Sequence, residues 1–421
     1  MMSASIDLVV VGLGYVGLPL ASQAVRSGVR VAGFDLNDAI VESLNAGRSH
    51  IDDLSDEDVG TMRANGFEAS TDTAVLGNAD AIVICVPTPL DDTGSPDLAA
   101  VKGASSGIAE QLRPGQLVVL ESTTYPGTTD DIVRPLLEAS GLAAGEDFFL
   151  AYSPERIDPG NATYGVQNTP KVVGGYDQAS TDRACKMYER FIDTVVPVGG
   201  TREAEMAKLL ENTYRHVNIA LVNEMAIFCH DLGIDLWESI EAAKTKPFGF
   251  QAFYPGPGVG GHCIPIDPNY LSYKVRTLGY PFRFVELAQE ISGRMPSYVV
   301  GRITHNLNKV QQSVNGAKIL LLGVTYKPDI ADERESPAQP LARRLLNLGA
   351  KLSYHDPLVK TWDIDGVSVP CVGDHLAAAE TADLTVLLQN HTSYDLEALA
   401  MRAHRVFDTR GSMVGPAVER M

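Results

Sequence analysis

A cysteine stands at the end of a stretch whose composition is rare in helices and strands. Residues 255–263 read PGPGVGGHC, with four glycines and two prolines before Cys263. This composition excludes a stable helix or a central strand, and it suits backbone that must wrap closely around a ligand. A free cysteine is ordinarily a small buried residue. At the end of this loop we predict that Cys263 is a nucleophile that carries a covalent intermediate. The other cysteines lie in apolar or helical segments and are expected to be structural: Cys85, Cys185, Cys229 and Cys371.

A lysine and an asparagine are spaced to share one face of a helix. Lys208 and Asn212 are four residues apart within an unbroken helical pattern that runs from Arg202 to about Leu232. His216 comes next on that face, and the sequence alone assigns it no role. A solvated helix face is the ordinary fate of such residues. Beside a dinucleotide-binding domain the pair is also typical of hydroxy-acid dehydrogenases, so by itself it leaves the substrate class open.

Two further segments carry charges that suit ligand binding. Residues 153–160, SPERIDPG, supply carboxylates in a turn after a predicted strand. Lys327 follows another predicted strand, and Arg334 lies seven residues beyond it. These cations would offset the net charge of −19 where a pyrophosphate has to bind. A charged surface loop is the competing interpretation for both segments.

A glycine pattern near the N-terminus predicts a dinucleotide site. Gly12, Gly14 and Gly17 follow the apolar run Leu8–Val11 and open a predicted helix. In this motif the glycines permit a tight turn, a close approach of the pyrophosphate and close helix–strand packing. Asp35 ends the next predicted strand, where an acid bonds the adenosine ribose and repels a 2′-phosphate. The context therefore favours NAD over NADP, although the glycine pattern alone would fit an ordinary turn.

Two later strand ends also carry polar residues. VPTP (86–89) ends one apolar run, and ESTTYPG (121–127) ends the next. Open α/β sheets bind ligands at the carboxyl ends of their strands. Such residues are also common in plain turns, so an ordinary turn is the competing interpretation for each segment.

The elements that must position these residues form an α/β pattern. Nearly continuous apolar strands alternate with helical segments, as in parallel sheets covered on both faces. The pattern returns after a helical middle, but the second α/β unit has no glycine fingerprint after its first strand, so we expect it to bind something other than a second dinucleotide. The predicted strands include Leu8–Val11, Val29–Phe34, Ala81–Val86, Leu117–Leu120, Lys318–Gly323 and Lys351–His355.

Composition limits the classes of function. The chain has 421 residues, 45% of them hydrophobic, which predicts two or three globular domains. With a net charge of −19, the protein should repel nucleic acid and anionic membranes. No apolar run approaches the length of a membrane span, and the N-terminus lacks the basic region of a signal peptide, so a cytoplasmic protein is expected. Scattered cysteines predict neither disulfides nor a metal site.

Taken together, these segments resemble the UDP-glucose/GDP-mannose dehydrogenase family. The matching segments occur in the family's order over most of the chain: GLGYVGLPLA, VPTP, ESTTYPGT, YSPERIDPG, EAEMAKLLENTYR, FYPGPGVGGHCIPIDP and GVTYKPDIADERESP. The resemblance implies two doubly wound Rossmann-like domains joined by a long central helix and a helical middle domain. Residues 1–200 would bind NAD, 201–315 would form the dimerising domain with the cysteine loop, and 316–421 would bind the UDP group.

The resemblance also implies roles for individual residues. The NAD contacts would be Gly12, Gly14, Tyr15, Val16, Gly17, Asp35, Pro87, Thr88, Thr124 and Arg334. The nucleotide sugar would be held by Glu155, Arg156, Lys208, Asn212, Tyr254, Gly258, Gly260, Tyr326, Lys327 and Arg410. The catalytic residues would be Cys263, Lys208, Asn212, Asp267, Thr124 and Glu155.

Within the family, residues 245–271 most resemble UDP-N-acetylglucosamine 6-dehydrogenases of surface-polysaccharide pathways. UDP-glucose 6-dehydrogenases more often read FGGSC, and His262 departs from that pattern. UDP-N-acetylmannosamine dehydrogenases also carry a GGHC loop, so the epimer stays open. The implied reaction oxidises the carbon-6 alcohol to an acid with two NAD, through a thiohemiacetal and a thioester on Cys263. The alternatives are a one-step hydroxy-acid dehydrogenase, which needs no such cysteine, and a non-catalytic nucleotide-binding module.

Overall fold

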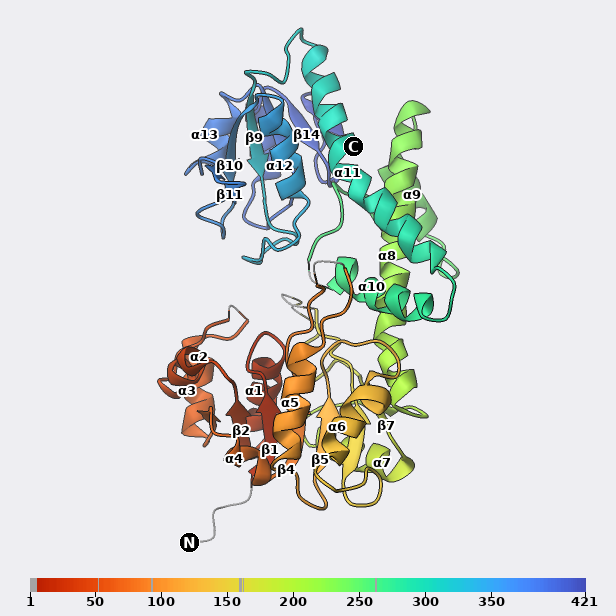
Figure 1. The fold of residues 1–421 in the computed structure, drawn as a ribbon. Helices are drawn as coiled ribbons and strands as arrows, with labels where there is room; N and C mark the ends of the chain where they lie inside the picture. Colours follow the sequence, from red (N-terminus) through yellow and green to blue (C-terminus); the bar gives the residue numbers. More distant parts are fainter. Residues whose placement is uncertain (1–5, 52, 92–93, 159–160, 162, 262) are drawn as a thin grey trace. The chain divides into compact units, whose positions relative to one another are not determined.

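The structure, a computed structural model, describes residues 6–421 apart from 52, 92–93, 159–160, 162 and 262 (Figure 1). The chain divides into two compact units. Unit 1 runs to Glu211 and takes in Asn269–Tyr280, and unit 2 comprises Asn212–Pro268 and Pro281–Met421. None of the helices among the described residues is long and apolar enough to cross a membrane.

Unit 1 contains an eight-stranded sheet in the order β3-β2-β1-β4-β5-β6-β7-β8. Neighbouring strands are parallel except β6 and β7. Apolar residues such as those of β1 are buried on both faces, as expected for a parallel sheet with helices on each side. The strands are β1 Ile6–Val11, β2 Val31–Phe34, β3 Glu68–Ser70, β4 Ala79–Ile84, β5 Leu117–Leu120, β6 Phe149–Tyr152, β7 Lys171–Gly175 and β8 Val195–Pro197.

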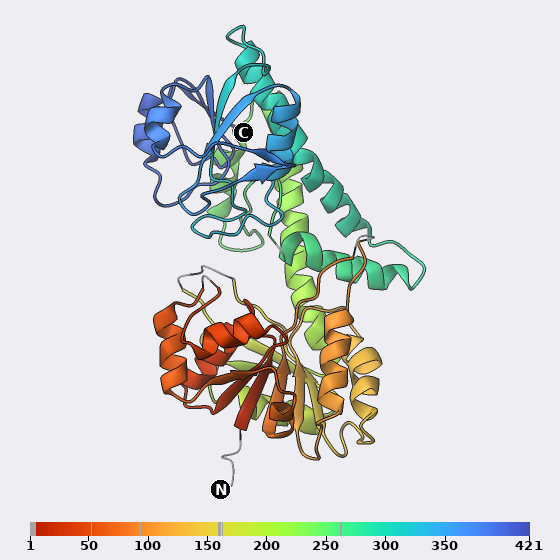
Figure 2. The same ribbon diagram turned by 60° about the vertical axis from the view of Figure 1, so that its left-hand side comes forward.

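Helices cover both faces of this sheet. The core on one face combines α1, α2, α3 and α7 with alternate strand residues such as Leu8 and Val10. Figure 2 shows the red helices on one side of the sheet and the orange ones on the other. The helices are α1 Gly17–Arg26, α2 Asp38–Asn45, α3 Asp56–Ala64, α4 Ala74–Gly77, α5 Ala99–Ala109, a π-helix Thr129–Val133, α6 Arg134–Glu138 and α7 Gln178–Tyr188.

Unit 2 contains a five-stranded parallel sheet in the order β10-β9-β13-β14-β15. One core joins the odd-numbered residues of β9 to α9, α11 and α12, and another joins its even-numbered residues to α13 and α14. The elements are α9 Leu236–Lys244, α11 Arg283–Asn308, β9 Lys318–Leu322, α12 Ala338–Asn347, β10 Lys351–His355, the hairpin β11 Asp363–Ile364 and β12 Val367–Ser368, α13 His375–Ala379, β13 Leu384–Leu387, α14 Leu396–Arg402, β14 Val406–Asp408 and β15 Val418–Arg420.

Two helices contribute residues to both units. Helix α8 covers Thr201–Asp231 without a break, within one residue at each end of the predicted helix. Helix α10, Cys263–Arg276, begins at the predicted nucleophile and contains Pro268. The predicted α/β class, with two parallel sheets and a helical middle region, is confirmed.

Some local predictions were wrong. The strand predicted as Ala81–Val86 begins and ends two residues earlier, because Val86 already belongs to the Pro-containing loop at residues 86–89. Cys371, expected to be structural, is exposed and lies in an isolated bridge with Tyr354. An apolar sequence neighbourhood does not ensure burial in a short surface segment.

Candidate active site

The predicted glycine turn connects β1 to α1. Gly12 has a φ of +90°, and a Cβ there would lie 2.8 Å from the carbonyl oxygen of Cys85. A Cβ on Gly17 would lie 1.9 Å from the carbonyl oxygen of Gly12. A Cβ on Gly14 would meet nothing within 4 Å. Glycine is therefore needed at two positions for packing, while the third leaves open space beside the N-terminus of a helix, which fits a pyrophosphate.

Asp35 follows β2 beside this turn. Its carboxylate accepts hydrogen bonds from the amides of Leu13 and Asn37, both at 2.9 Å. The side chain remains partly exposed. Asp35 thus ties the glycine turn to the second strand, and its exposed edge suits a ribose diol.

The carboxyl ends of neighbouring strands extend this edge of the sheet. Adjacent parallel strands lie about 4.8 Å apart, and the order β2-β1-β4-β5-β6 sets the following residues in turn along the edge: Asp35, Gly12, Thr88, Thr124 and Glu155. Thr124 is fully buried, and its hydroxyl has no hydrogen-bond partner among the described residues. A buried hydroxyl in this state is expected to acquire a partner when a ligand binds.

The remaining predicted NAD contacts of unit 1 lie on the same loops. Tyr15 is 48% exposed, Val16 is partly buried and immediately precedes α1, and Pro87 is exposed. Arg334, the predicted contact from unit 2, forms an ion pair of 2.6 Å with Asp332.

Glu155 and Arg156 follow β6, and both have partners within unit 1. The carboxylate of Glu155 accepts from the amide of Ile157 at 2.5 Å. Arg156 pairs with Glu211 of α8 at 2.6 Å and donates to the carbonyl of Pro170 at 2.6 Å. The two neighbouring residues therefore face different partners.

A buried ionic cluster that sequence reasoning missed lies behind Glu155. The Lys171 ammonium is 2.8 Å from the Glu121 carboxylate and 4.0 Å from that of Glu155. Glu121 is fully buried and also accepts from the hydroxyl of Tyr188. Burial acts to lower the pKa of Lys171, but the two carboxylates outweigh it and raise that pKa. A buried cation thus stands against one face of the predicted catalytic carboxylate.

Helix α8 carries Lys208 and Asn212, and both are buried instead of solvated. The ammonium of Lys208 donates to the hydroxyl of Thr123 at 2.5 Å within unit 1. Asn212 donates to the carboxylate of Asp267 at 2.6 Å within unit 2. Asp267 lies four residues after Cys263 on α10, so these two positions share a helix face. His262 and the side chain of Cys263 lie outside the described part.

His216 lies one turn beyond Asn212 on α8. It is 2% exposed, and neither ring nitrogen has a hydrogen-bond partner among the described residues. Burial lowers the pKa of His216 to about 4, so the ring is neutral at neutral pH. The helical spacing predicted correctly that His216 shares a face with Asn212. Spacing alone does not predict whether the imidazole nitrogens form hydrogen bonds.

The glycine-rich loop packs against the first loop of the unit 2 sheet. A Cβ on Gly260 would lie 2.7 Å from the Cβ of Tyr326, and one on Gly258 would lie 2.9 Å from the side chain of Pro337. The amide of Gly256 donates to Asn223 of α8 at 2.9 Å. The glycines here serve close packing, which brings two of the predicted substrate segments together.

Lys327 lies in a loop that is held by a buried histidine. His391 Nδ1 accepts from the amide of Asp329 at 2.9 Å, and its Nε2 lies 3.1 Å from the carboxylate of Asp356. The hydroxyl of Thr325 closes the loop by donating to the carbonyl of Lys327 at 2.9 Å. Sequence reasoning missed His391 because it lies more than sixty residues from the loop that it holds.

The other two predicted substrate residues have different surroundings. Arg410 donates to the carbonyl of Leu388 at 2.6 Å, and burial lowers its pKa to about 10. Tyr254 is 40% exposed and stacks on the buried Trp237, and its hydroxyl donates to Glu241 at 2.5 Å.

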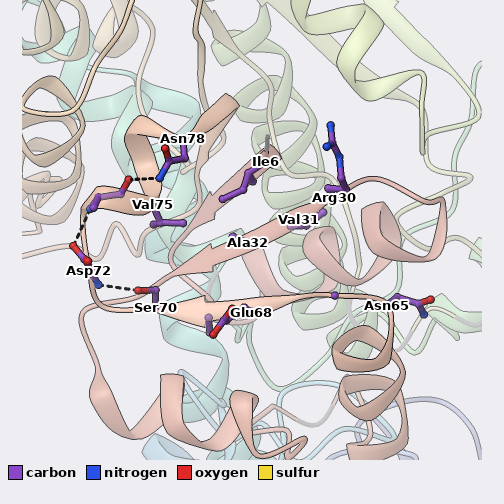
Figure 3. A pocket seen from close by; sticks show the side chains of 13 residues that line it. Ile6, Arg30, Val31, Ala32, Asn65, Glu68, Ser70, Asp72, Val75 and Asn78 are labelled. Carbon is purple, nitrogen blue, oxygen red and sulfur yellow. Dashed lines mark hydrogen bonds between the residues drawn. The ribbon is translucent and has the colours of Figure 1, made fainter. Parts of the chain in front are cut away.

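A separate hollow of about 580 Å³ lies beside β1–β3 and the short helix α4 (Figure 3). Its lining includes Arg30, Glu68 and Asn78 and none of the predicted site residues. A four-residue helix leaves part of the sheet uncovered at this point. The hollow therefore does not coincide with the predicted site at the strand ends described above.

The comparisons with known proteins agree with this arrangement. Three models of the UDP-glucose/GDP-mannose dehydrogenase family match: the NAD binding domain at residues 6–192, the central domain at 202–293 and the UDP binding domain at 320–414. The chain is 34% identical to the UDP-N-acetyl-D-glucosamine 6-dehydrogenase of Pseudomonas aeruginosa, covering 97% of this chain and 92% of that protein. It is 33% identical to the UDP-N-acetyl-D-mannosamine dehydrogenase of Pyrococcus horikoshii, covering 98% and 97%.

Solved structures give the same assignment. A UDP-D-ManNAc dehydrogenase structure from Pyrococcus horikoshii matches with a TM-score of 0.88 at 32% identity and covers 98% of both chains. A UDP-glucose dehydrogenase from Pyrobaculum islandicum matches with a TM-score of 0.87 at 28% identity, covering 100% of this chain and 97% of that one. With a dinucleotide turn, a central helix and a second α/β unit all accounted for, this chain belongs to the UDP-glucose/GDP-mannose dehydrogenase family and is an NAD-dependent nucleotide-sugar dehydrogenase.

Proposed function

We propose that this enzyme oxidises the carbon-6 alcohol of a UDP-hexose, UDP-N-acetylglucosamine first among them, to the carboxylate. The observation that carries the proposal is the 2.6 Å hydrogen bond from Asn212 to Asp267. It fixes the helix that begins at Cys263 against the helix that carries Lys208 and Asn212. A one-step hydroxy-acid dehydrogenase would need no cysteine at the start of this helix.

The cysteine position suits covalent chemistry. Cys263 is the first residue of α10, and the N-terminus of a helix favours negative charge. A thiolate adds to the carbon-6 aldehyde and forms a thiohemiacetal, whose further oxidation gives a thioester. Water then hydrolyses the thioester to the acid and releases the thiol. Bound NAD supplies the acceptor for the hydride in each of the two oxidations.

The other residues of the site manage charge and protons. The Lys208 ammonium stabilises the negative charge that develops on the carbon-6 oxygen. Asp267, held by Asn212, accepts and returns protons with Thr124, and Glu155 assists the hydrolytic water. Tyr326, Lys327 and Arg410 hold the UDP group. NAD is held by the glycine turn and Asp35. The open space at Gly14 supports this assignment, as does the Thr124 hydroxyl, which has no partner within the described ranges.

The proposal also names the sugar, an N-acetylated hexose, and the assembly, a homodimer. An N-acetylated hexose is supported by the two relatives named for N-acetylglucosamine and N-acetylmannosamine, and the uronic acid would enter surface-polysaccharide synthesis in the cytoplasm. A homodimer is supported by an exposed apolar stripe on α8, formed by Tyr214, Leu221 and Phe228 at intervals of seven residues.

The test is the yield of NADH per UDP-sugar. Purified enzyme is expected to form about two NADH per sugar, with the highest kcat/KM on UDP-N-acetylglucosamine in a panel that includes UDP-glucose, UDP-N-acetylmannosamine and the galacto epimers. One NADH per sugar would overturn the four-electron reaction. A different preferred sugar would overturn the substrate assignment alone.

Cys263→Ala is expected to abolish acid formation because no thiohemiacetal can form, while NAD and UDP-sugar still bind. Cys371→Ala is the matched control, since that cysteine is exposed and far along the chain in a surface bridge. Binding is checked by calorimetry and acid formation by mass spectrometry. Two-NADH turnover by the Cys263 variant would remove the covalent step.

A further inference from the structure

A buried carboxylate on α8 holds the loop that carries Thr124. Glu205 is fully buried, and one of its oxygens accepts from the amide of Gly127 at 2.6 Å. The other accepts from the amide of Thr129 at 2.9 Å and from its hydroxyl at 2.8 Å. Thr124, Gly127, Thr129 and Glu205 all belong to unit 1. Glu205 thus accepts three hydrogen bonds from the far end of the loop after β5.

The near end of the same loop is held one helical turn further on. Lys208, three residues after Glu205, donates to Thr123 at 2.5 Å. Residues at this spacing lie on one face of a helix. Between the two attachment points lies Thr124, whose buried hydroxyl has no hydrogen-bond partner in the part of the chain that the structure describes. One turn of α8 therefore anchors both ends of the segment that presents this hydroxyl.

We propose that Glu205 is a positioning residue, which acts by holding residues 123–129 so that the Thr124 hydroxyl and the Lys208 ammonium keep a fixed relation. The inference deepens the proposed function, because the roles of Thr124 and Lys208 rest on it. Glu205 itself need touch neither the sugar nor NAD. Its three hydrogen bonds require acceptor oxygens, so the ionised carboxylate is the form that holds the loop.

The charge state of Glu205 changes near neutrality. Burial raises its pKa to about 7, against the hydrogen bonds from Thr129 and Gly127 that lower it, and the nearby Asp130 raises it further. Around this loop Asp130 and Asp131 pair with Arg202, and Lys274 lies 3.8 Å from Asp131 and over the ring of Tyr125. Protonation of Glu205 removes an acceptor from the loop.

The first test is the pH profile of kcat. In the wild-type enzyme kcat is expected to fall as pH drops through about 7, because the holding carboxylate is lost. Glu205→Gln is expected to lower kcat on the order of tenfold to a hundredfold, as misplaced catalytic groups do, and its kcat should no longer change with pH in this range. Glu203→Gln, an exposed neighbour on α8, is the matched control.

A milder variant keeps the test informative if Glu205→Gln folds poorly. Valine has nearly the same shape as threonine, so Thr129→Val removes only the hydroxyl that donates to Glu205. The ionised carboxylate of Glu205 is then less stabilised. The acid limb of kcat is then expected to move to higher pH. A merely structural residue would not shift this limb. An unmoved limb in Thr129→Val, or a wild-type profile in Glu205→Gln, would overturn the proposal.

A second readout does not depend on turnover. The pKa of Glu205 rises from 4.5 to about 7 on folding, so the folded state binds the proton more tightly and stability falls as pH rises across that interval. The free energy of unfolding of the wild type should therefore decline relative to Glu205→Gln between these pH values. Absence of this difference contradicts the placement of Glu205. Absence of UDP-sugar oxidation by the wild type contradicts the proposed function alone.

Discussion

At the residue scale, Asp35 combines structure with a predicted role in cofactor choice. Asp35→Ala is expected to weaken NAD binding by about 1–3 kcal/mol, since the ribose partner and the acceptor of the Leu13 amide are both removed. Asp35→Asn keeps one acceptor oxygen without the charge, so it should narrow the preference for NAD over NADP. The KM values for both cofactors provide the measurement.

Asp38→Asn is the control for the charge change, because Asp38 is exposed in the first turn of α2. Equal NAD affinity in the wild type and in Asp35→Ala would exclude Asp35 from the cofactor site.

Residues of the site could be predicted where their signal is local in sequence. The glycine turn is one such case, since its three glycines follow one another at a fixed spacing directly after an apolar run, although close packing requires glycine only at Gly12 and Gly17. Glu205 and His391 could not be predicted, because their roles depend on partners more than sixty residues away. A single buried carboxylate or imidazole carries no periodic pattern that would mark it.

At the element scale, a buried ion pair joins β7, which carries Lys171, to Glu121 at the end of β5. The side chains of Lys171 and Glu121 are 7% and 0% exposed. Lys171→Met is expected to lower the free energy of unfolding by about 3–5 kcal/mol, because Glu121 is left as an unpaired buried charge. Urea denaturation of the whole chain measures the change.

Two further variants show whether charge is the cause. The double variant Lys171→Met with Glu121→Gln should recover much of the lost stability, since no charge then remains buried. Arg402→Met breaks the exposed pair with Glu380 and should change the free energy of unfolding far less than Lys171→Met does, because water screens exposed charges. A single Lys171 variant as mild as this surface control would contradict the argument.

Elements were predicted best where apolar periodicity is long. Helix α8 differs from its predicted range by one residue at each end, because nothing in its 31 residues interrupts the pattern. The end of β4 was misplaced because Val86 is apolar but lies next to a loop with two prolines. Short segments at element ends depend on turn geometry, which apolar character does not report.

At the scale of the whole molecule, the apolar stripe on α8 predicts self-association. Leu221 and Phe228 are 52% and 45% exposed, an unusual state for large apolar side chains seven residues apart. Leu221→Lys with Phe228→Lys is expected to convert a dimer to monomers, measured by light scattering after size exclusion. Arg215→Glu, exposed on another side of α8, is the control. A monomeric wild type, or a variant of unchanged mass, would contradict the dimer.

The two α/β units build the same turn twice. Gly12 donates to the carbonyl of Phe34, and Gly323 donates to that of His355. The amide of Val324 donates to Asp356 at 2.8 Å, as that of Leu13 does to Asp35. The difference lies in access to the acid: Asp35 is partly exposed, whereas Asp356 is 1% exposed.

His391 accounts for this difference, because its ring lies against the Asp356 carboxylate where a ribose would approach in the first unit. An imidazole from the chain itself has taken the position of a ligand hydroxyl. The second unit therefore keeps the geometry of the turn, while a side chain of the chain itself contacts the acid. Engineering a second dinucleotide site into this unit would therefore begin with replacement of His391 and not with addition of glycines.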